Sequence, residues 1–229
     1  MSVRIVSHSV PCDETNGTSM LDMVAYCARV SNPANQTNMA TGEKLVRYLM
    51  KNDHWSPLEM VSVCLEIETT RDIARQILRH RSFSFQEFSQ RYAIADIGAE
   101  VREARLQDKK NRQNSIETDD TKLAEEWMDR QELLIAHAKD TYTWALDNGI
   151  AKEQARAVLP EGNTKSTVYV NGTLRSWVHY IELRSANGTQ KEHMDIAHEC
   201  AKVIAKVIPL VTNLSLIHIS APTRRRGNA

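Results

Sequence analysis

The sequence carries no net charge and contains no long hydrophobic run. Lys and Arg together number 29, as do Asp and Glu, in 229 residues. A chain without an overall field does not attract nucleic acid or an anionic membrane through its net charge, so any anion must be bound by local groups. No apolar run reaches the roughly 18 residues that span a bilayer. The composition therefore favours a globular protein with at most a local anion site.

Cysteine is scarce and widely spaced. The chain has four cysteines, and no two form a Cys-x-x-Cys pair: Cys12, Cys27, Cys64 and Cys200. Such cysteines are predicted to be reduced thiols, and a cytoplasmic location is expected. Cys64 falls in an apolar strand pattern and Cys200 in a late helical pattern, which favours packing over a nucleophilic role.

Motifs of common metal and dinucleotide sites are also missing. There is no His-Glu-x-x-His run. His193 and His198 are five residues apart, which separates them by about 140° around a helix. We therefore expect no metal site. No Gly-x-Gly-x-x-Gly run is present, so a Rossmann crevice is not predicted.

Hydrophobic periodicity divides the chain into helices and a few short strands. Helices are predicted over residues 21–30, 41–52, 72–81, 123–148, 152–159, 174–184 and 190–208. Strands are predicted over residues 2–10, 61–69 and 168–170, and loops or turns over residues 54–59, 161–167 and 171–173. The polar residues 93–120 are expected to form a surface segment or a short strand with a loop. The pattern indicates a single α+β domain over residues 1–213, with helices around a small central antiparallel sheet.

The last residues do not continue this pattern. From Leu214 the chain reads LSLIHISAPTRRRGNA, and part of this stretch resembles the translation of a transposon-type sequencing adapter. We expect residues 214–229 to be non-native, and a genuine disordered tail with a basic end is the alternative. Functional interpretation is therefore confined to residues 1–213.

The stretch RHRSFSFQEFSQRY, residues 79–92, concentrates cations, hydroxyls and every phenylalanine of the chain. If the preceding helix extends through it, Gln76, Arg79 and His80 lie on one helix face, because their spacing is i, i+3 and i+4. An amide can hydrogen-bond a base edge, and a guanidinium can bind a phosphate through two hydrogen bonds. The next residues are predicted to form a loop that adds further polar groups: Ser84, Glu87, Ser89 and Arg91.

Composition alone leaves three interpretations of residues 79–92 open. They are a solvated basic helix end beside a hydrophobic loop, a DNA-reading helix, and a pocket for a phosphorylated planar molecule walled by Phe83, Phe85 and Phe88. The neutral net charge and the absence of a helix-turn-helix pattern argue against DNA. A nucleotide, with phosphate, sugar and planar base, suits the third interpretation.

The spacing within this stretch resembles the signature of the flavin-dependent thymidylate synthases, RHRxxSxNExSxRY. The matching positions are Arg79, His80, Arg81, Ser84, Glu87, Ser89, Arg91 and Tyr92. Gln86 stands where the family usually has Asn, and it keeps the amide while adding a methylene.

Three further segments resemble the same family. HWSPLE at 54–59 resembles its H-x-[ST]-P-x-E segment, ARAVLP at 155–160 its AR-x-x-LP segment, and NGTLRSWVHYIELR at 171–184 the helix that ends in its catalytic arginine. Taken alone, these segments are a Pro turn, a surface arginine and an arginine favourable to a helix dipole. Together the resemblance covers roughly residues 5–209.

The resemblance implies a site shared by a nucleotide and a flavin. For deoxyuridine monophosphate (dUMP) it implies Gln76, Arg79, Glu87, Phe88, Ser89, Gln90, Arg91, Arg156 and Arg184. For FAD it implies Ser56, Arg79, His80, Arg81, Glu87, Thr173, Leu174, Arg175 and His179. Several arginines around a dianionic phosphate are chemically reasonable.

By the same resemblance the protein methylates dUMP to dTMP. Arg184 is the expected catalytic residue, because a fixed cation near the N3–C4=O edge of uracil stabilises the charge that develops during addition at C5. The family uses methylenetetrahydrofolate as carbon donor and FAD, reduced by NADPH, as hydride donor. It needs no cysteine nucleophile, and its homotetramer forms each site where subunits meet. Trp127 and Trp144, on the long helix, are predicted to be core or interface anchors.

Two alternatives to an enzyme remain open. A nucleotide- or nucleic-acid-binding protein without catalysis would be colourless and would bind nucleic acid with a steep salt dependence. A protein with the family's shape but without activity would bind flavin and show no turnover.

Overall fold

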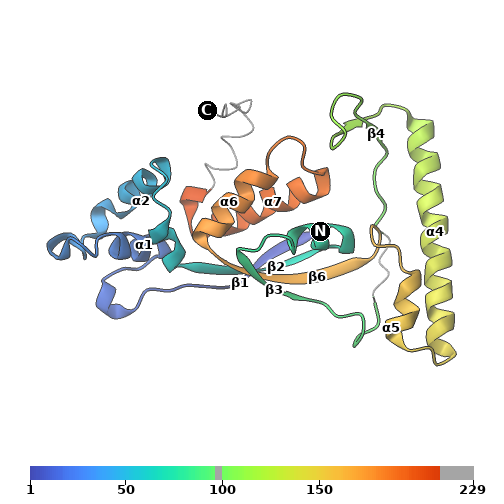
Figure 1. Cartoon of the computed structure of the whole chain (residues 1–229), viewed down its shortest axis with the longest axis horizontal. Coiled ribbons are helices and arrows are strands. Elements are labelled where there is room, and N and C mark those ends of the chain that lie inside the picture. Colours follow the sequence, from blue (N-terminus) through green and yellow to red (C-terminus); the bar gives the residue numbers. More distant parts are fainter. Residues whose placement is uncertain (96–99, 212–229) are drawn as a thin grey trace.

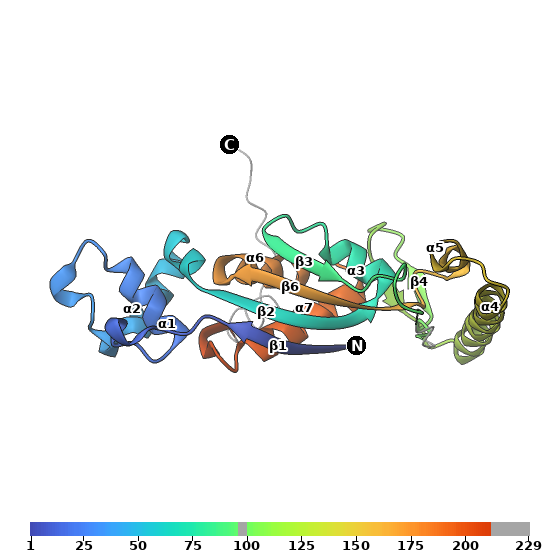
Figure 2. The same cartoon turned by 90° about the horizontal axis from the view of Figure 1, so that it is seen from below.

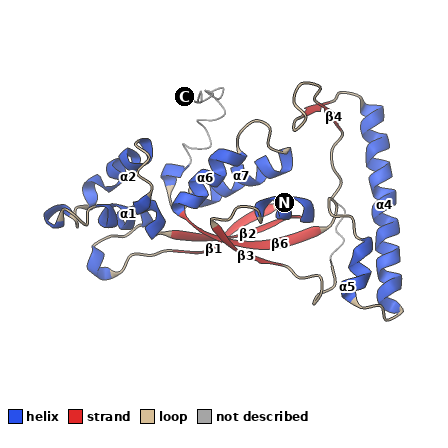
Figure 3. Ribbon diagram, in the orientation of Figure 1, coloured by secondary structure: helices blue, strands red, loops and turns tan. Residues whose placement is uncertain are grey.

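The computed structural model describes residues 1–95 and 100–211, so the predicted tail at 214–229 lies outside the described residues. The body is elongated (Figures 1 and 2), with α1 (Met20–Ala28) and α2 (Gly42–Lys51) at one end. A small sheet occupies the middle, and α4 (Thr121–Asp147) and α5 (Lys152–Ala155) form the other end. Figure 3 shows helices around a short sheet, and the predicted α+β fold is confirmed.

The central sheet is antiparallel, with strand order β1-β2-β6-β3. Its strands are β1 (Ser2–His8), β2 (Ser62–Thr70), β6 (Lys165–Thr173) and β3 (Phe83–Glu87). Successive side chains of a strand point to opposite faces. On β2, therefore, Val63, Leu65 and Ile67 share one face, and all three are fully buried. A separate hairpin joins β4 (Arg105–Gln107) to β5 (Ser115–Glu117), in the segment expected to be surface or a short strand with a loop.

Helices cover one face of the sheet. They are α3 (Arg71–Ile77), α6 (Leu174–Arg184) and α7 (Lys191–Ile204), whose apolar residues join those of β2 and β6 in one core. Trp177 of α6 is fully buried there, and its Nε1 donates to the carbonyl oxygen of Val63 at 2.9 Å. The opposite face carries exposed side chains: Arg4, Glu68, Gln86 and Tyr169. The sheet thus offers one open face beside the residue 79–92 stretch.

The helix predicted over residues 72–81 ends at Ile77. Beyond it, the amide of Arg79 bonds the carbonyl of Gln76 and that of His80 bonds the carbonyl of Ile77, a tightening to i→i+3 spacing. The prediction that Gln76, Arg79 and His80 share a helix face is therefore wrong, since only Gln76 is on the helix. Residues 83–87 form β3 and not the predicted loop.

Strand β6 is longer than predicted and includes residues 171–173, which were expected to turn. Asn-Gly is a strong hairpin signal. Here, however, Gly172 lies opposite Phe83 of β3, and a Cβ on Gly172 would sit 2.2 Å from the Phe83 ring. The glycine therefore serves a close approach between strands.

Helix α4 has an exposed apolar side. Its buried stripe includes Ile135, Ala138 and Tyr142. Leu134 is 53% exposed, and Trp144 is 59% exposed. Trp127 is also exposed, so the two tryptophans are not core residues of the described chain. Among the described residues, no helix is both long enough and apolar enough to cross a membrane.

Candidate functional site

The residue 79–92 stretch meets the start of α6 because β3 pairs with β6. Thr173 ends β6 and caps α6, with its Oγ1 accepting from the amide of Ser176 at 3.3 Å. The Ser176 hydroxyl in turn donates to the carbonyl of Ser82 at 3.1 Å. Two segments that are far apart in the sequence, residues 79–84 and 172–176, are thereby held together.

Several other residues predicted for FAD lie around this helix start. The Arg175 guanidinium pairs with the carboxylate of Glu59, in the 3₁₀ helix Ser56–Met60. The His179 ring packs edge-on against Trp55, with ring centroids 4.6 Å apart. The Leu174 side chain is 1% exposed within the core, so only its backbone could reach a ligand. Predicted flavin residues of α6 thus meet the Ser56–Met60 segment at the start of that helix. His80 instead lies at the other end of α6, beside Arg184, and Glu87 lies beside Ser166.

Arg184, the predicted catalytic residue, ends α6 and bonds the motif histidine. Its Nε donates to Nε2 of His80 at 2.9 Å. Burial lowers the pKa of His80 to about 4, and the nearby Arg184 charge contributes to the same shift. His80 is therefore neutral near pH 7, with its proton on Nδ1. The remaining guanidinium N–H groups of Arg184 have no partner within the described part of the chain and are available as donors.

Gln76 contacts a buried histidine, His193, that was not among the predicted site residues. His193 is fully buried, with Nδ1 3.1 Å from Oε1 of Gln76 and Nε2 3.1 Å from the hydroxyl of Tyr180. Burial lowers the pKa of His193 to about 3, helped by the charges of Arg184 and His80. A signal did exist in the sequence. His193 shares the buried helix side with residues 196, 197 and 200, at i+3, i+4 and i+7.

The strand β3 ends in a segment that lines cavities. The Glu87 carboxylate accepts from the Ser166 hydroxyl at 3.0 Å and lies 4.0 Å from the Arg71 guanidinium. Phe88, 38% exposed, lines a cavity of about 490 Å³ on the open sheet face and another of about 360 Å³. Phe83 instead packs on Trp177 in the core, with centroids 4.6 Å apart, so it does not wall a pocket as predicted.

The next residues connect the sheet to α5. The Arg91 guanidinium lies 3.4 Å from the Glu153 carboxylate. The hydroxyl of Ser89 accepts from the Arg91 amide. Gln90 is 2% exposed, and its buried Nε2 has no hydrogen-bond partner among the described residues. A buried donor without a partner is costly, which fits a segment built to meet a ligand.

Three predicted guanidinium groups make no side-chain hydrogen bond or ion pair within residues 1–95 and 100–211. Arg79 and Arg81 are exposed beside the Arg184–His80 pair, and Arg156 is half-buried. Such groups fit the phosphates of dUMP and FAD. Arg156 directly follows α5, however, which lies well away from α6 in both Figures 1 and 2. The chain therefore brings most of the predicted residues together, but not Arg156 and Arg184.

The described residues contain no group of three or more His, Cys, Asp or Glu side chains arranged to hold a metal ion. Burial raises the pKa of the Cys64 thiol and, more strongly, that of the fully buried Cys200 thiol. Neither thiol is placed to act as a nucleophile at neutral pH.

Comparison with known proteins gives relatives over nearly the whole chain. The family model described as thymidylate synthase complementing protein matches residues 15–210. A probable flavin-dependent thymidylate synthase of Paramecium bursaria Chlorella virus 1 is 46% identical over 211 residues, covering 92% of this chain and 97% of the relative. A flavin-dependent thymidylate synthase of Synechocystis sp. is 46% identical over 213 residues, with the same two coverages.

Solved structures with a similar fold include a UMP/dUMP methylase from Streptomyces cacaoi. Its crystal structure with 5-Br dUMP superposes with a TM-score of 0.77 at 27% identity, covering 96% of this chain and 97% of that one. The same methylase with 5-Br UMP gives a TM-score of 0.79, with 96% of each chain covered. The similarity thus extends from sequence to fold.

Proposed function

The chain belongs to the flavin-dependent thymidylate synthase family, and we propose that it catalyses the reductive methylation of dUMP to dTMP with a bound FAD. The observation that carries this proposal is the Arg184–His80 hydrogen bond at the meeting point of α6 and the residue 79–92 stretch. This hydrogen bond fixes the permanent cation of Arg184 near other guanidinium and amide donors of the same stretch. A uracil nucleotide needs both kinds of group.

The phosphate of dUMP is assigned to the guanidinium groups. Arg79 and Arg156 have no competing side-chain partner among the described residues. Arg91 pairs with Glu153, but both side chains are at least half exposed and such a pair is weak, so the phosphate can replace it. In the same proposal, Glu87, Phe88, Ser89 and Gln90 contact the nucleotide, and Gln76 faces the base.

Arg184 acts on the charge that develops on the uracil ring. A guanidinium stays protonated at any working pH, and the neutral His80 orients it without cancelling its charge. Cationic donors aimed at a developing anion are worth about 3–4 kcal/mol in transition-state free energy. We assign this role to Arg184 because it ends α6 and is held in place by His80. Burial raises the pKa of the Cys64 and Cys200 thiols, so neither competes as a nucleophile.

FAD is assigned to the segments that meet at the start of α6. Arg79 and Arg81, which pair with no side chain in the described part of the molecule, offer cations for its diphosphate. The other assigned contacts are Ser56, His80, Glu87, Thr173, Leu174, Arg175 and His179. When bound and reduced, FAD supplies a hydride. The proposal includes NADPH as the reductant and methylenetetrahydrofolate as the carbon donor, and it includes no metal.

We further propose a cytoplasmic homotetramer with shared sites. Two observations support shared sites. The segment directly after α5, which holds Arg156, lies well away from α6, which ends in Arg184. Helix α4 also exposes apolar residues such as Leu134 and Trp144. Exposed apolar patches of this kind mark interaction surfaces. A second subunit could bring an Arg156 to the site of the first.

The test is an absorption spectrum of the purified protein followed by anaerobic addition of NADPH, with and without dUMP. We expect flavin bands that NADPH bleaches, faster when dUMP is present, and dTMP once methylenetetrahydrofolate is added. In Arg184→Ala the flavin should remain bound while dTMP formation falls by at least about 100-fold. Arg47→Ala, which removes an exposed arginine of α2, is the control with normal turnover.

Each failure has its own meaning. A colourless protein that takes up no added FAD would overturn the flavin assignment and favour a nucleic-acid-binding protein. Bound flavin without dTMP formation would indicate an inactive relative. Near-normal turnover in Arg184→Ala would remove Arg184 from the chemistry and leave the rest of the proposal standing.

A further inference from the structure

A line of hydrogen bonds runs from buried Tyr180 on α6 to the first turn of α7. The Tyr180 hydroxyl lies 3.1 Å from Nε2 of His193, whose Nδ1 lies 3.1 Å from Oε1 of Gln76. Nε2 of Gln76 donates to Oε1 of Gln190 at 2.7 Å, and Nε2 of Gln190 donates to Oε2 of Glu192 at 2.8 Å. Each side chain from Tyr180 to Gln190 can both donate and accept, so each can pass the direction of its hydrogen bond to the next side chain.

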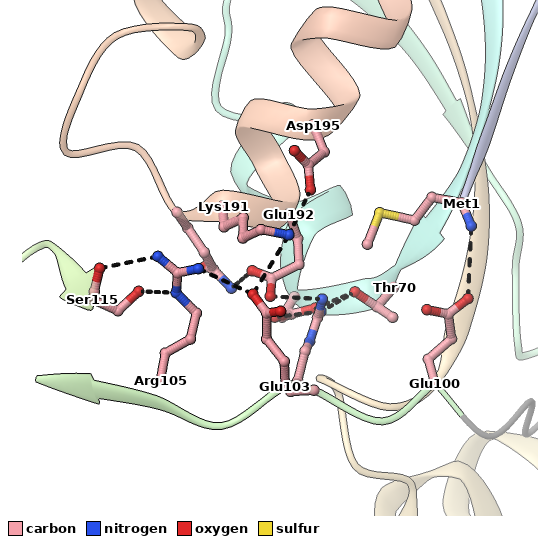
Figure 4. Close-up of polar contacts among 12 residues, drawn as sticks. Met1, Thr70, Glu100, Glu103, Arg105, Ser115, Lys191, Glu192 and Asp195 are labelled. Atoms are coloured by element: carbon pink, nitrogen blue, oxygen red, sulfur yellow. Dashed lines mark hydrogen bonds and ion pairs between the residues drawn. The ribbon is translucent and has the colours of Figure 1, made fainter. Parts of the chain in front are cut away.

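The line ends on a charge that can only accept. Nη1 of Arg102 lies 3.5 Å from Oε1 of Glu192, and both side chains are largely buried, with 17% and 15% exposed. Arg102 is itself fixed, because its Nη2 donates to the Asp72 carboxylate at 3.0 Å and to the Thr70 hydroxyl at 2.6 Å. Figure 4 shows Glu192 among the polar contacts that join α7 to residues 100–117. An ionised carboxylate has only acceptor atoms, and Oε2 of Glu192 accepts from Gln190.

This fixed end determines the direction of every other bond. Because Glu192 accepts, the amide nitrogen of Gln190 must face it, which turns the Gln190 oxygen toward Gln76. Gln76 must then donate, so its own oxygen faces His193. His193 has to carry its proton on Nδ1, and its Nε2 accepts from the Tyr180 hydroxyl. Burial keeps His193 neutral, as this pattern requires.

The direction decides what Gln76 can offer a ligand. Its oxygen is occupied by His193 and one N–H by Gln190, so the second N–H is the group left without a partner among residues 1–95 and 100–211. The Gln76 amide lies near the Arg184–His80 pair. The centroid of the His80 ring is 6.3 Å from that of His193, which Gln76 contacts, and 4.9 Å from that of Tyr180. A base bound there meets a donor at Gln76.

We propose that Glu192 is a positioning residue that, through Gln190, holds Gln76 as a hydrogen-bond donor, and that Gln76 thereby selects uracil over cytosine by donating to O4. This inference rests on the proposed function, which places a pyrimidine nucleotide at this site. Cytosine carries an amino group where uracil carries O4, so two donors would face each other. A site built for one pattern rejects the other because buried polar groups are left unpaired.

The test compares dissociation constants for dUMP and dCMP, measured by titration calorimetry on the FAD-loaded full chain. We expect the wild type to prefer dUMP by at least about 100-fold. Glu192→Gln has nearly the same shape but can donate as well as accept, so Gln76 can reverse. The preference should then fall by about tenfold, mainly through tighter binding of dCMP. Glu199→Gln, on the same helix and outside the line, is the matched control and should keep the wild-type preference.

Gln190→Ala tests the same proposal by a second route, in case Glu192→Gln fails to fold. Gln190 is exposed, so Gln190→Ala removes the link to Glu192 without opening the core. It should lower the preference as Glu192→Gln does. If both variants keep the wild-type preference within about twofold, or if the wild type itself binds dCMP as well as dUMP, the positioning role is overturned. If the wild type binds neither nucleotide and forms no dTMP, the proposed function has failed instead.

Discussion

Burial and a neighbouring arginine determine the protonation of two histidines, His80 and His193. His80 and His193 lie in the same buried region as Arg184, which places a cation near both rings. Each has an ordinary pKa of 6.5 that burial and the guanidinium lower, to about 4 for His80 and about 3 for His193. Both are therefore acceptors at neutral pH, one for Arg184 and the other for Tyr180.

The lowered pKa values of His80 and His193 make the free energy of unfolding depend on pH below about pH 6.5. As the pH falls below 6.5, the unfolded chain binds a proton at each histidine, whereas the folded chain does so only near pH 4 and pH 3. The free energy of unfolding should therefore fall with decreasing pH across that window, by at most about 1.4 kcal/mol per pH unit for each histidine. Urea unfolding from pH 7.5 to 4.5 measures the slope. His80→Asn should flatten it, and an unchanged slope in that variant would contradict the assignment.

At the residue scale, the sequence could identify chemical groups but not their pairing. Arg184 and His80 were both recognisable from the family's motifs. Their hydrogen bond is not, because it depends on how the end of α3 meets the end of α6. His193 illustrates the opposite case: its spacing from His198 excluded a metal pair and indicated no other role, yet the ring carries two hydrogen bonds.

At the scale of elements, the helices were predictable and the edge of the sheet was not. Long periodic patterns located α4, α6 and α7 to within a few residues. Strand β3 escaped detection because its five residues hold Ser84 and Gln86 on the open face, which resembles a polar loop. The second half of β6 was missed because Asn171-Gly172 signals a turn wherever no neighbouring strand is known.

Gly172 gives this pairing a direct test. In Gly172→Ala the new methyl group would meet the Phe83 ring at 2.2 Å, so β3 and β6 must move apart or the ring must leave its site. Overpacking of this kind costs about 1–3 kcal/mol. Gly162→Ala is the matched control, because a Cβ there meets nothing closer than 4.0 Å. Urea unfolding at one protein concentration compares the two variants.

The origin of the loss can be separated from a general effect of alanine. Adding Phe83→Leu to Gly172→Ala removes the atoms that clash and should restore part of the stability, a coupling expected only of residues in contact. Equal stability of Gly172→Ala and the wild type would show that the two strands do not approach as closely as described.

At the scale of the whole molecule, α4 is incompletely covered. A helix whose apolar surface exceeds what its own chain buries is expected to pack on another molecule. Leu134 and Trp127 lie on the helix side next to its buried stripe and remain exposed, whereas the exposed Trp144 is about 140° around the helix from the centre of that stripe. We therefore expect this side to belong to the subunit interface of the proposed tetramer.

Sedimentation velocity can check this expectation. Leu134→Asp places a charge on the apolar side and should shift the protein from the tetramer to a smaller species. Lys139→Asp introduces the same side chain at another exposed position of α4 and should leave the tetramer intact. A tetramer that persists in Leu134→Asp would place the interface elsewhere, and a monomeric wild type would refute the assembly itself.

The strand order has a consequence for synthesis of the protein. Among the described strands, β3 hydrogen-bonds only β6, and residues 88–164 separate them in the chain. On the ribosome, at about 5–20 residues per second, the nascent β3 waits several seconds for its partner to be made. An unpaired edge strand is a template for wrong pairing, and such distant pairing is slow to form. Residues 79–92, which hold many of the proposed ligand contacts, are thus among the last to reach their native pairing. Rapid synthesis of this protein should therefore increase its need for a chaperone that covers the unpaired strand.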